Sequence, residues 1–108
     1  MNYLSKYLIE EAAAISSSAK NLDDKEVCKA LDLLDNIYKN KLKVIVSGVG
    51  KSGIVARKIA ATFSSVGLTS IYLNPLDALH GDIGIVNKND LCILLSNSGE
   101  TSELLEII

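Results

Sequence analysis

The sequence predicts an α/β fold in which two N-terminal helices precede a parallel sheet with helices on both faces. Two observations predict it. From about residue 43 onward, short aliphatic runs alternate with longer helical patterns, an order that is typical of parallel strands joined by right-handed crossovers. Glycine loops directly follow the first and the third predicted strand. We therefore expect a helical segment over residues 1–42 and a sheet domain over residues 43–108.

The N-terminal segment is predicted to form two amphipathic helices. The first covers residues 4–20, where apolar side chains recur every three or four positions, at Leu4, Leu8, Ala12 and Ile15. The second covers residues 24–39, and Asp23 with Glu26 resembles a capping box at its start. Such a pair of helices either covers one face of a sheet or forms an interface between subunits. The sequence leaves both possibilities open.

Three apolar segments predict the sheet. The first strand lies near residues 43–48, and the other two lie within residues 69–75 and 90–99. A helix over residues 51–67 joins the first two strands, and another helix is expected over residues 100–108. Open sheets of this class usually have about five or six strands. We therefore expect a truncated, incomplete domain, whose sheet edge is covered by another chain, is buried by oligomerisation, or costs stability.

The composition excludes several classes of function. The formal net charge is −2 over 108 residues, so no basic surface is expected to attract nucleic acid. A single histidine and scattered acidic residues offer no metal site. No segment resembles a signal peptide or a membrane span, and we expect a cytoplasmic protein. Cys28 and Cys92 are expected to be small core residues.

The loop after the first strand, "SGVGKSG", resembles two nucleotide motifs and satisfies neither. A Walker A loop needs a glycine five positions before Gly50, where Ile45 stands. A dinucleotide fingerprint needs an acidic residue at the end of the second strand, where Asn74 stands. Lys51, Ser52 and the backbone N–H groups at the start of a helix remain, and these groups suit an anion.

The loop after the third strand, "SNSGETSE", gathers hydroxyl groups at the start of another helix, namely those of Ser96, Ser98, Thr101 and Ser102. Loops at the carboxyl ends of parallel strands can face a common pocket. We therefore expect the hydroxyls of Ser96, Ser98 and Thr101 to approach Ser52, so that one phosphate is bound between the two loops. The alternative is that the serine cluster only caps a helix.

The two loops together resemble the sugar isomerase (SIS) domain, and residues 44–108 resemble the D-arabinose-5-phosphate isomerase family almost throughout, including "ALHGD". The resemblance implies a flavodoxin-like α/β sandwich. It implies that Ser52, Ser96, Ser98 and Thr101 hold the phosphate, with Asn97 and Gly99 shaping the second loop and Gly50 the first. It also implies an active site lined by Lys51, His80 and Glu103.

The implied reaction interconverts D-arabinose 5-phosphate and D-ribulose 5-phosphate, without cofactor or metal, on the route to the KDO sugar of lipopolysaccharide. Lys51 would balance charge on the substrate, His80 would carry protons, and Glu103 would act as base or open the sugar ring. The family also implies a homo-oligomer, a tetramer. The family's chains continue beyond this C-terminus with further active-site residues. The alternative is therefore a non-catalytic module that binds a sugar phosphate, with a nucleotide-binding module as a third and more distant possibility.

Overall fold

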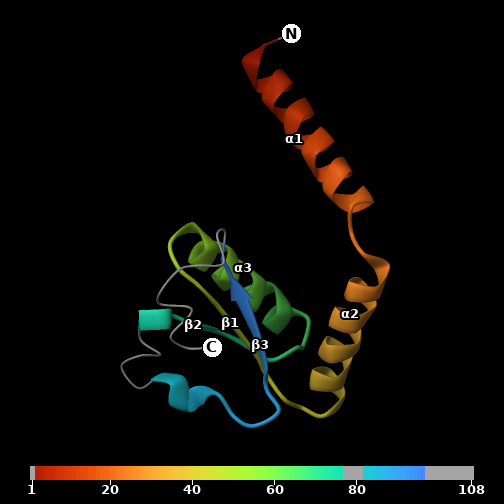
Figure 1. The fold of residues 1–108 in the computed structure, drawn as a ribbon. Helices are drawn as coiled ribbons and strands as arrows, with labels where there is room; N and C mark the ends of the chain where they lie inside the picture. The colour runs from red at the N-terminus through yellow and green to blue at the C-terminus, as the bar shows by residue number, and fades with distance from the viewer. Residues whose placement is uncertain (1, 77–81, 97–108) are drawn as a thin grey trace. The chain divides into compact units, whose positions relative to one another are not determined.

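The computed structural model describes residues 2–76 and 82–96. Within them, two helices are followed by a strand, a helix, a second strand, a short 3-10 helix and a third strand (Figure 1). The helix predicted for residues 100–108 lies outside the described residues. The chain divides into two compact units, Met1–Asp32 and Leu33–Ile108.

Helix α1, Tyr3–Lys20, confirms the first predicted helix. It begins at Asn2, whose side-chain Oδ1 accepts the backbone N–H of Ser5 at 2.8 Å, as expected of an N-terminal cap. None of its residues is buried. Its exposed large side chains are Tyr3, Leu4, Tyr7, Leu8, Ile9 and Ile15.

Helix α2, Asp24–Lys39, begins where the capping pattern predicts. Asp23 Oδ1 accepts the backbone N–H of Lys25 at 2.9 Å, so the capping role predicted for Asp23 is confirmed. The Glu26 carboxylate does not complete a capping box but lies 3.8 Å from the ammonium group of Lys29. An exposed pair at this spacing stabilises a helix only slightly.

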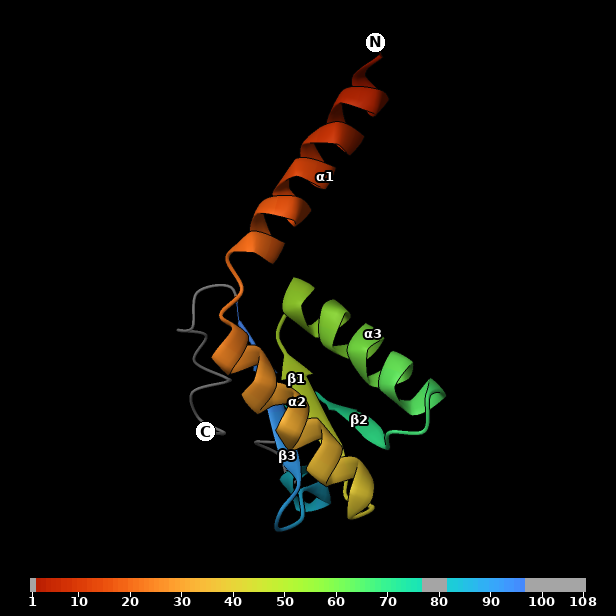
Figure 2. The same ribbon diagram turned by 90° about the vertical axis from the view of Figure 1, so that its right-hand side faces the viewer.

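The sheet is parallel and has the strand order β2-β1-β3 within the described residues (Figures 1 and 2). Strand β1, Val44–Gly48, lies in the centre and is buried along its whole length. Helix α3, Lys51–Ser65, connects it to β2, Ser70–Leu73. The 3-10 helix η1, Asp82–Ile85, precedes β3, Leu91–Leu95. The predicted α/β class with a parallel sheet is thus confirmed.

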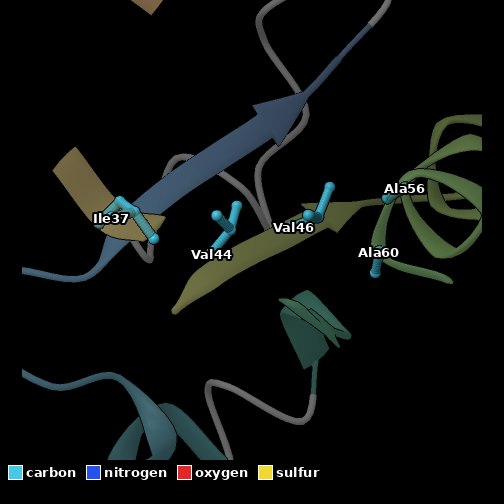
Figure 3. Close-up of a cluster of buried hydrophobic side chains, with 5 residues drawn as sticks. All are labelled: Ile37, Val44, Val46, Ala56 and Ala60. Atoms are coloured by element: carbon cyan, nitrogen blue, oxygen red, sulfur yellow. The ribbon is translucent and has the colours of Figure 1, made fainter. Parts of the chain in front are cut away.

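One face of the sheet packs against helices. Val44 and Val46 on this face form one buried cluster with Ala56 and Ala60 of α3 and with Ile37 near the end of α2 (Figure 3). All five side chains are at most 6% exposed. The two alanines allow α3 to lie close to the strand, because a small side chain keeps the helix backbone near the sheet.

The opposite face of the sheet is less completely covered by the described residues. Ile45 and Leu73 are buried there, with Val86 packed against them. Cys92 pairs with Ile45 across the ladder and therefore points to this same face, yet it is exposed. The prediction that Cys28 and Cys92 are core residues is wrong, since Cys28 on α2 is also exposed.

An ion pair joins the residues that precede β1 and β3. Lys43 Nζ lies 2.6 Å from Asp90 Oδ2, and the Asp90 side chain is 2% exposed. The same carboxylate accepts the backbone N–H of Asn87 at 2.8 Å and that of Lys43 at 3.3 Å. Burial alone would raise the pKa of Asp90, but these hydrogen bonds and the Lys43 charge outweigh it and lower the pKa.

Candidate functional site

Three glycines shape the connection between β1 and α3. Gly50 has φ 60° and ψ −126°, a conformation that residues other than glycine rarely adopt. A Cβ on Gly48 would lie 2.8 Å from the backbone carbon and oxygen of Ser52, and a Cβ on Gly53 would lie 2.7 Å from the Gly48 oxygen. The G-x-G-x-x-G spacing therefore produces a close approach of strand and helix.

Unpaired backbone donors lie at the start of α3. The N–H groups of Gly53 and Ile54 both donate to the Gly50 oxygen, at 3.1 and 3.3 Å. No side chain caps this helix. Within the part of the chain that the structure describes, the N–H groups of Lys51 and Ser52 have no backbone acceptor. These two N–H groups lie at the positive end of the helix dipole, where an anion is stabilised.

A pocket of about 490 Å³ lies beside this helix start. It is lined by Lys51, Ser52 and Val55 from α3 and by Leu95 and Ser96 at the end of β3. Because β1 and β3 are adjacent and parallel, the loops that follow them lie at the same edge of the sheet. The structure therefore brings a lysine and a serine from the start of α3 and a serine from the end of β3 around one cavity.

The described residues contain only part of the predicted site. Lys51, Ser52 and Ser96 line the pocket, and Gly50 precedes them as the cap residue of α3. Lys51 is exposed, whereas Ser52 and Ser96 are half-buried. The remaining predicted site residues lie outside the described residues: His80, Asn97, Ser98, Gly99, Thr101 and Glu103.

Two apolar residues of the pocket were missed by the sequence analysis. Val55 follows Lys51 by four positions on α3, so both lie on the same side of the helix, and this spacing could have identified it. Leu95 is the last residue of β3 and faces the same side of the sheet as Gly48, its partner in the ladder. They add an apolar wall to an otherwise polar site.

A second hollow, of about 530 Å³, lies where the strands begin. It is lined by Ile37, Tyr38, Lys39, Lys41, Leu42, Gly67, Leu68 and Thr69, and it contains no predicted site residue. Ligands of open α/β sheets bind at the carboxyl ends of the strands. The pocket beside Ser52 and Ser96 is therefore the better candidate, although it is slightly smaller.

The described residues, 2–76 and 82–96, contain neither a metal site nor a membrane span. No group of three or more histidine, cysteine, aspartate or glutamate side chains in these ranges could hold a metal ion. None of the helices in the same ranges is long and apolar enough to cross a membrane.

Curated proteins with similar sequences include two arabinose 5-phosphate isomerases. The chain is 45% identical over 101 residues to KpsF of Escherichia coli O6:H1, which covers 94% of this chain and 30% of that protein. It is 40% identical over 89 residues to KdsD of Francisella tularensis, which covers 82% of this chain and 27% of that protein. The chain thus matches at most 30% of the length of these two relatives.

Solved structures show the same fold. An E. coli CFT073 protein in complex with arabinose 5-phosphate is 39% identical to this chain with a TM-score of 0.81, and the match covers 98% of this chain and 57% of that one. A Listeria monocytogenes protein is 30% identical with a TM-score of 0.87, and the match covers 99% of this chain and 58% of that one.

The match to a family model places the fold and the pocket in one family. The model of the SIS domain matches residues 36–108, which include the whole described sheet, α3 and every residue that lines the pocket. This range is more than half of the chain, and with these sequence and structural similarities it shows that the chain belongs to the SIS domain family.

Proposed function

We propose that this chain binds a sugar phosphate in the pocket between α3 and the end of β3, as part of an isomerase of D-arabinose 5-phosphate and D-ribulose 5-phosphate. The observation that carries the proposal is that Lys51, Ser52 and Ser96 line one pocket. The ligand is supported by the names of two relatives, both arabinose 5-phosphate isomerases, and by the related structure in complex with arabinose 5-phosphate.

The described part of the pocket suits a phosphoryl group. A phosphate carries only acceptor oxygens, and the start of α3 offers the N–H groups of Lys51 and Ser52, the Ser52 hydroxyl and the Lys51 ammonium group. Hydrogen bonds to a charged oxygen are stronger than neutral ones. The apolar side chains of Val55 and Leu95 form the rest of the described pocket wall beside these donors.

The second loop would complete the phosphate site. By the family motif, Ser98 and Thr101 add hydroxyl groups to that of Ser96, while Asn97 and Gly99 shape the loop. This assignment rests on the "SNSGETSE" pattern and on the position of Ser96 at the pocket. The proposal thus predicts one phosphate held by two loops that follow adjacent strands.

The proposed reaction moves one proton between neighbouring carbons of the open-chain sugar. A base removes the proton from C2 of the aldose while the C1 carbonyl oxygen gains a proton, giving an enediol. Loss of the proton from the C2 oxygen and gain of one at C1 then produce the ketose. Glu103 is assigned the role of base or ring-opening group, His80 the role of proton carrier, and Lys51 the stabilisation of negative charge.

The binding prediction is tested with Lys51→Ala and a matched control, Lys58→Ala, which removes another exposed lysine of α3 that does not line the pocket. Calorimetric titration with D-arabinose 5-phosphate should show a Kd for Lys51→Ala about ten- to a hundredfold above that of the wild type, because a charge-assisted hydrogen bond is lost. The Kd of Lys58→Ala should stay within about twofold of the wild-type value.

Turnover is measured separately, as formation of D-ribulose 5-phosphate. Binding with turnover that disappears in Glu103→Ala supports the isomerase. Binding without turnover supports the alternative of a non-catalytic sugar-phosphate module. A chain that binds no sugar phosphate, or that prefers NAD or ATP, contradicts the proposal. A homo-oligomer and a cytoplasmic location belong to the same proposal and rest on the resemblance to the family.

A further inference from the structure

A tyrosine on β2 contacts the last residue of β1, where the connection to α3 begins. The hydroxyl of Tyr72, on β2, donates to the carbonyl oxygen of Gly48 at 3.1 Å. Gly48 is the last residue of β1, so its carbonyl belongs to the first peptide of the loop that leads to Lys51 and Ser52. The guanidinium carbon of Arg57, on α3, lies 4.8 Å from the centre of the Tyr72 ring and restrains the ring by a cation–π contact.

Besides Tyr72, the first turn of α3 also lies close to the Gly48 carbonyl oxygen. A Cβ placed on Gly53 would lie 2.7 Å from the Gly48 oxygen and 3.1 Å from the Tyr72 hydroxyl. The carbonyl therefore lies between the first turn of the helix and the tyrosine, and a side chain at residue 53 would disturb both. Among the described residues, the Tyr72 hydroxyl is the side-chain group that donates to the Gly48 oxygen.

A hydrogen bond to this carbonyl determines the direction of the following N–H. The peptide between Gly48 and Val49 is trans, since the described residues contain no cis peptide bond. In a trans peptide the C=O and N–H groups point in opposite directions. With the Gly48 oxygen directed at Tyr72, the Val49 N–H points away from Tyr72. The orientation of the loop that enters α3 is thereby fixed at its first peptide.

We propose that Tyr72 is a positioning residue, whose hydroxyl orients the Gly48–Val49 peptide and so holds Lys51 and Ser52 in place to bind phosphate. The proposal rests on the proposed function and deepens it. Tyr72 does not line the pocket, so it acts through the loop and not by contact with the ligand. Orienting the donors before binding lowers the entropy lost when phosphate binds, because less of the loop must be ordered.

The substitution Tyr72→Phe removes the hydroxyl and retains the aromatic ring, its packing and the Arg57 contact. Tyr38→Phe is the matched control, because Tyr38 belongs to the same unit of the chain and its side chain is exposed. Calorimetric titration with D-arabinose 5-phosphate is carried out at 25 °C, with circular dichroism to verify that each variant is folded. We expect the Kd of Tyr72→Phe to rise about three- to tenfold, and that of Tyr38→Phe to stay unchanged.

Amide hydrogen exchange of the unliganded protein gives an independent readout. Exchange at Val49 and Gly50 should be faster in Tyr72→Phe than in the wild type, while exchange in the central residues of β1 should stay the same. A merely structural role would lower the melting temperature and leave both the Kd and the exchange at these two residues unchanged, and this result would overturn the inference.

The two proposals fail in different ways. If the wild type binds D-arabinose 5-phosphate and Tyr72→Phe binds it equally well, the positioning role is wrong and the proposed function stands. If the wild type does not bind the sugar phosphate, the proposed function is wrong and the positioning of phosphate donors is overturned with it. Exchange at Val49 and Gly50 then reports only whether the hydroxyl orders the loop.

Discussion

Gly48 and Gly53 determine how closely β1 and α3 approach each other. Each would bring a Cβ to within 2.8 Å of backbone atoms of the other segment, a separation that real Cβ atoms do not adopt. The missing side chains let the helix begin directly beside the end of the strand. This proximity places Lys51 and Ser52 at the carboxyl edge of the sheet, next to Ser96.

Gly53→Ala is therefore expected to destabilise the protein by about 1–3 kcal/mol, because either the strand end or the helix must shift to relieve the overlap. The measurement is the free energy of unfolding in urea. Gly84→Ala is the matched control, since a Cβ at Gly84 meets nothing within 4 Å. Equal stability of the two alanine variants would contradict the close approach of strand and helix.

At the scale of the elements, the starts of β1 and β3 are held together by one buried carboxylate. Asp90 pairs with the Lys43 side chain and accepts two backbone N–H groups. The carboxylate thereby provides an acceptor for these charged and N–H groups at the end of the sheet opposite the pocket. The two residues are 47 positions apart in the sequence, so only the parallel pairing of the strands brings them together.

Asp90→Asn is expected to lower the free energy of unfolding by about 2 kcal/mol at pH 7, because the amide retains the size of the carboxylate and loses its charge. The pKa of Asp90 is lowered from its ordinary value of 3.8. Its stabilising contribution is thus complete above the unfolded pKa and is lost as the pH falls through the lower folded value. Urea unfolding between pH 7 and pH 2 tests this.

The difference in stability between the wild type and Asp90→Asn should therefore shrink below about pH 4. Asp35→Asn serves as the control, since Asp35 pairs with Lys39 on the surface of α2, where both side chains are more than half exposed. Its effect on stability at pH 7 should be smaller than that of Asp90→Asn. A pH-independent difference for Asp90→Asn would show that the lost charge is not the cause.

At the scale of the whole molecule, the two faces of the sheet are covered to different extents by the described residues. The face that carries Val44 and Val46 packs against helices. The opposite face buries Ile45 and Leu73 but leaves Cys92 exposed. A parallel sheet normally has both faces covered, and among residues 2–76 and 82–96 the side that carries Cys92 is the less completely covered one.

Both thiols are expected to react with a disulfide reagent in the native protein, because Cys28 and Cys92 are exposed. Although its side chain is exposed, Cys92 is partly desolvated by its neighbours, and this partial burial, with a smaller contribution from the charge of Asp90, raises its pKa. Its thiolate fraction at pH 8 is thus below that of an ordinary thiol, and its reaction should be slow and accelerate as the pH rises. In the variant Cys28→Ser only the Cys92 thiol remains, so its reaction rate is measured alone. Reaction of Cys92 only after denaturation would contradict its exposure.

Local sequence patterns predicted the helices and strands well, but they predicted poorly which side chains are buried and which contacts those side chains make. The bounds of α2 were predicted correctly because Asp23 is a strong start signal and the apolar spacing continues to Tyr38, one residue before the helix ends. The exposure of Cys92 was not predicted, because an apolar run does not show which side of a strand is covered. The Tyr72 contact with Gly48 was also missed, since strand patterns carry no information on side-chain hydrogen bonds between strands.

The sequence by itself determined the α/β class, the glycine turn between β1 and α3, and the family, because these depend on the order and spacing of residue types along the chain. The sequence predicted that Ser52 and Ser96 approach each other, but only the tertiary structure decided that they line the same pocket and that Lys43 pairs with Asp90. Both results require the register of β1 against β3. That register follows from the packing of whole strands and not from any local run of residues.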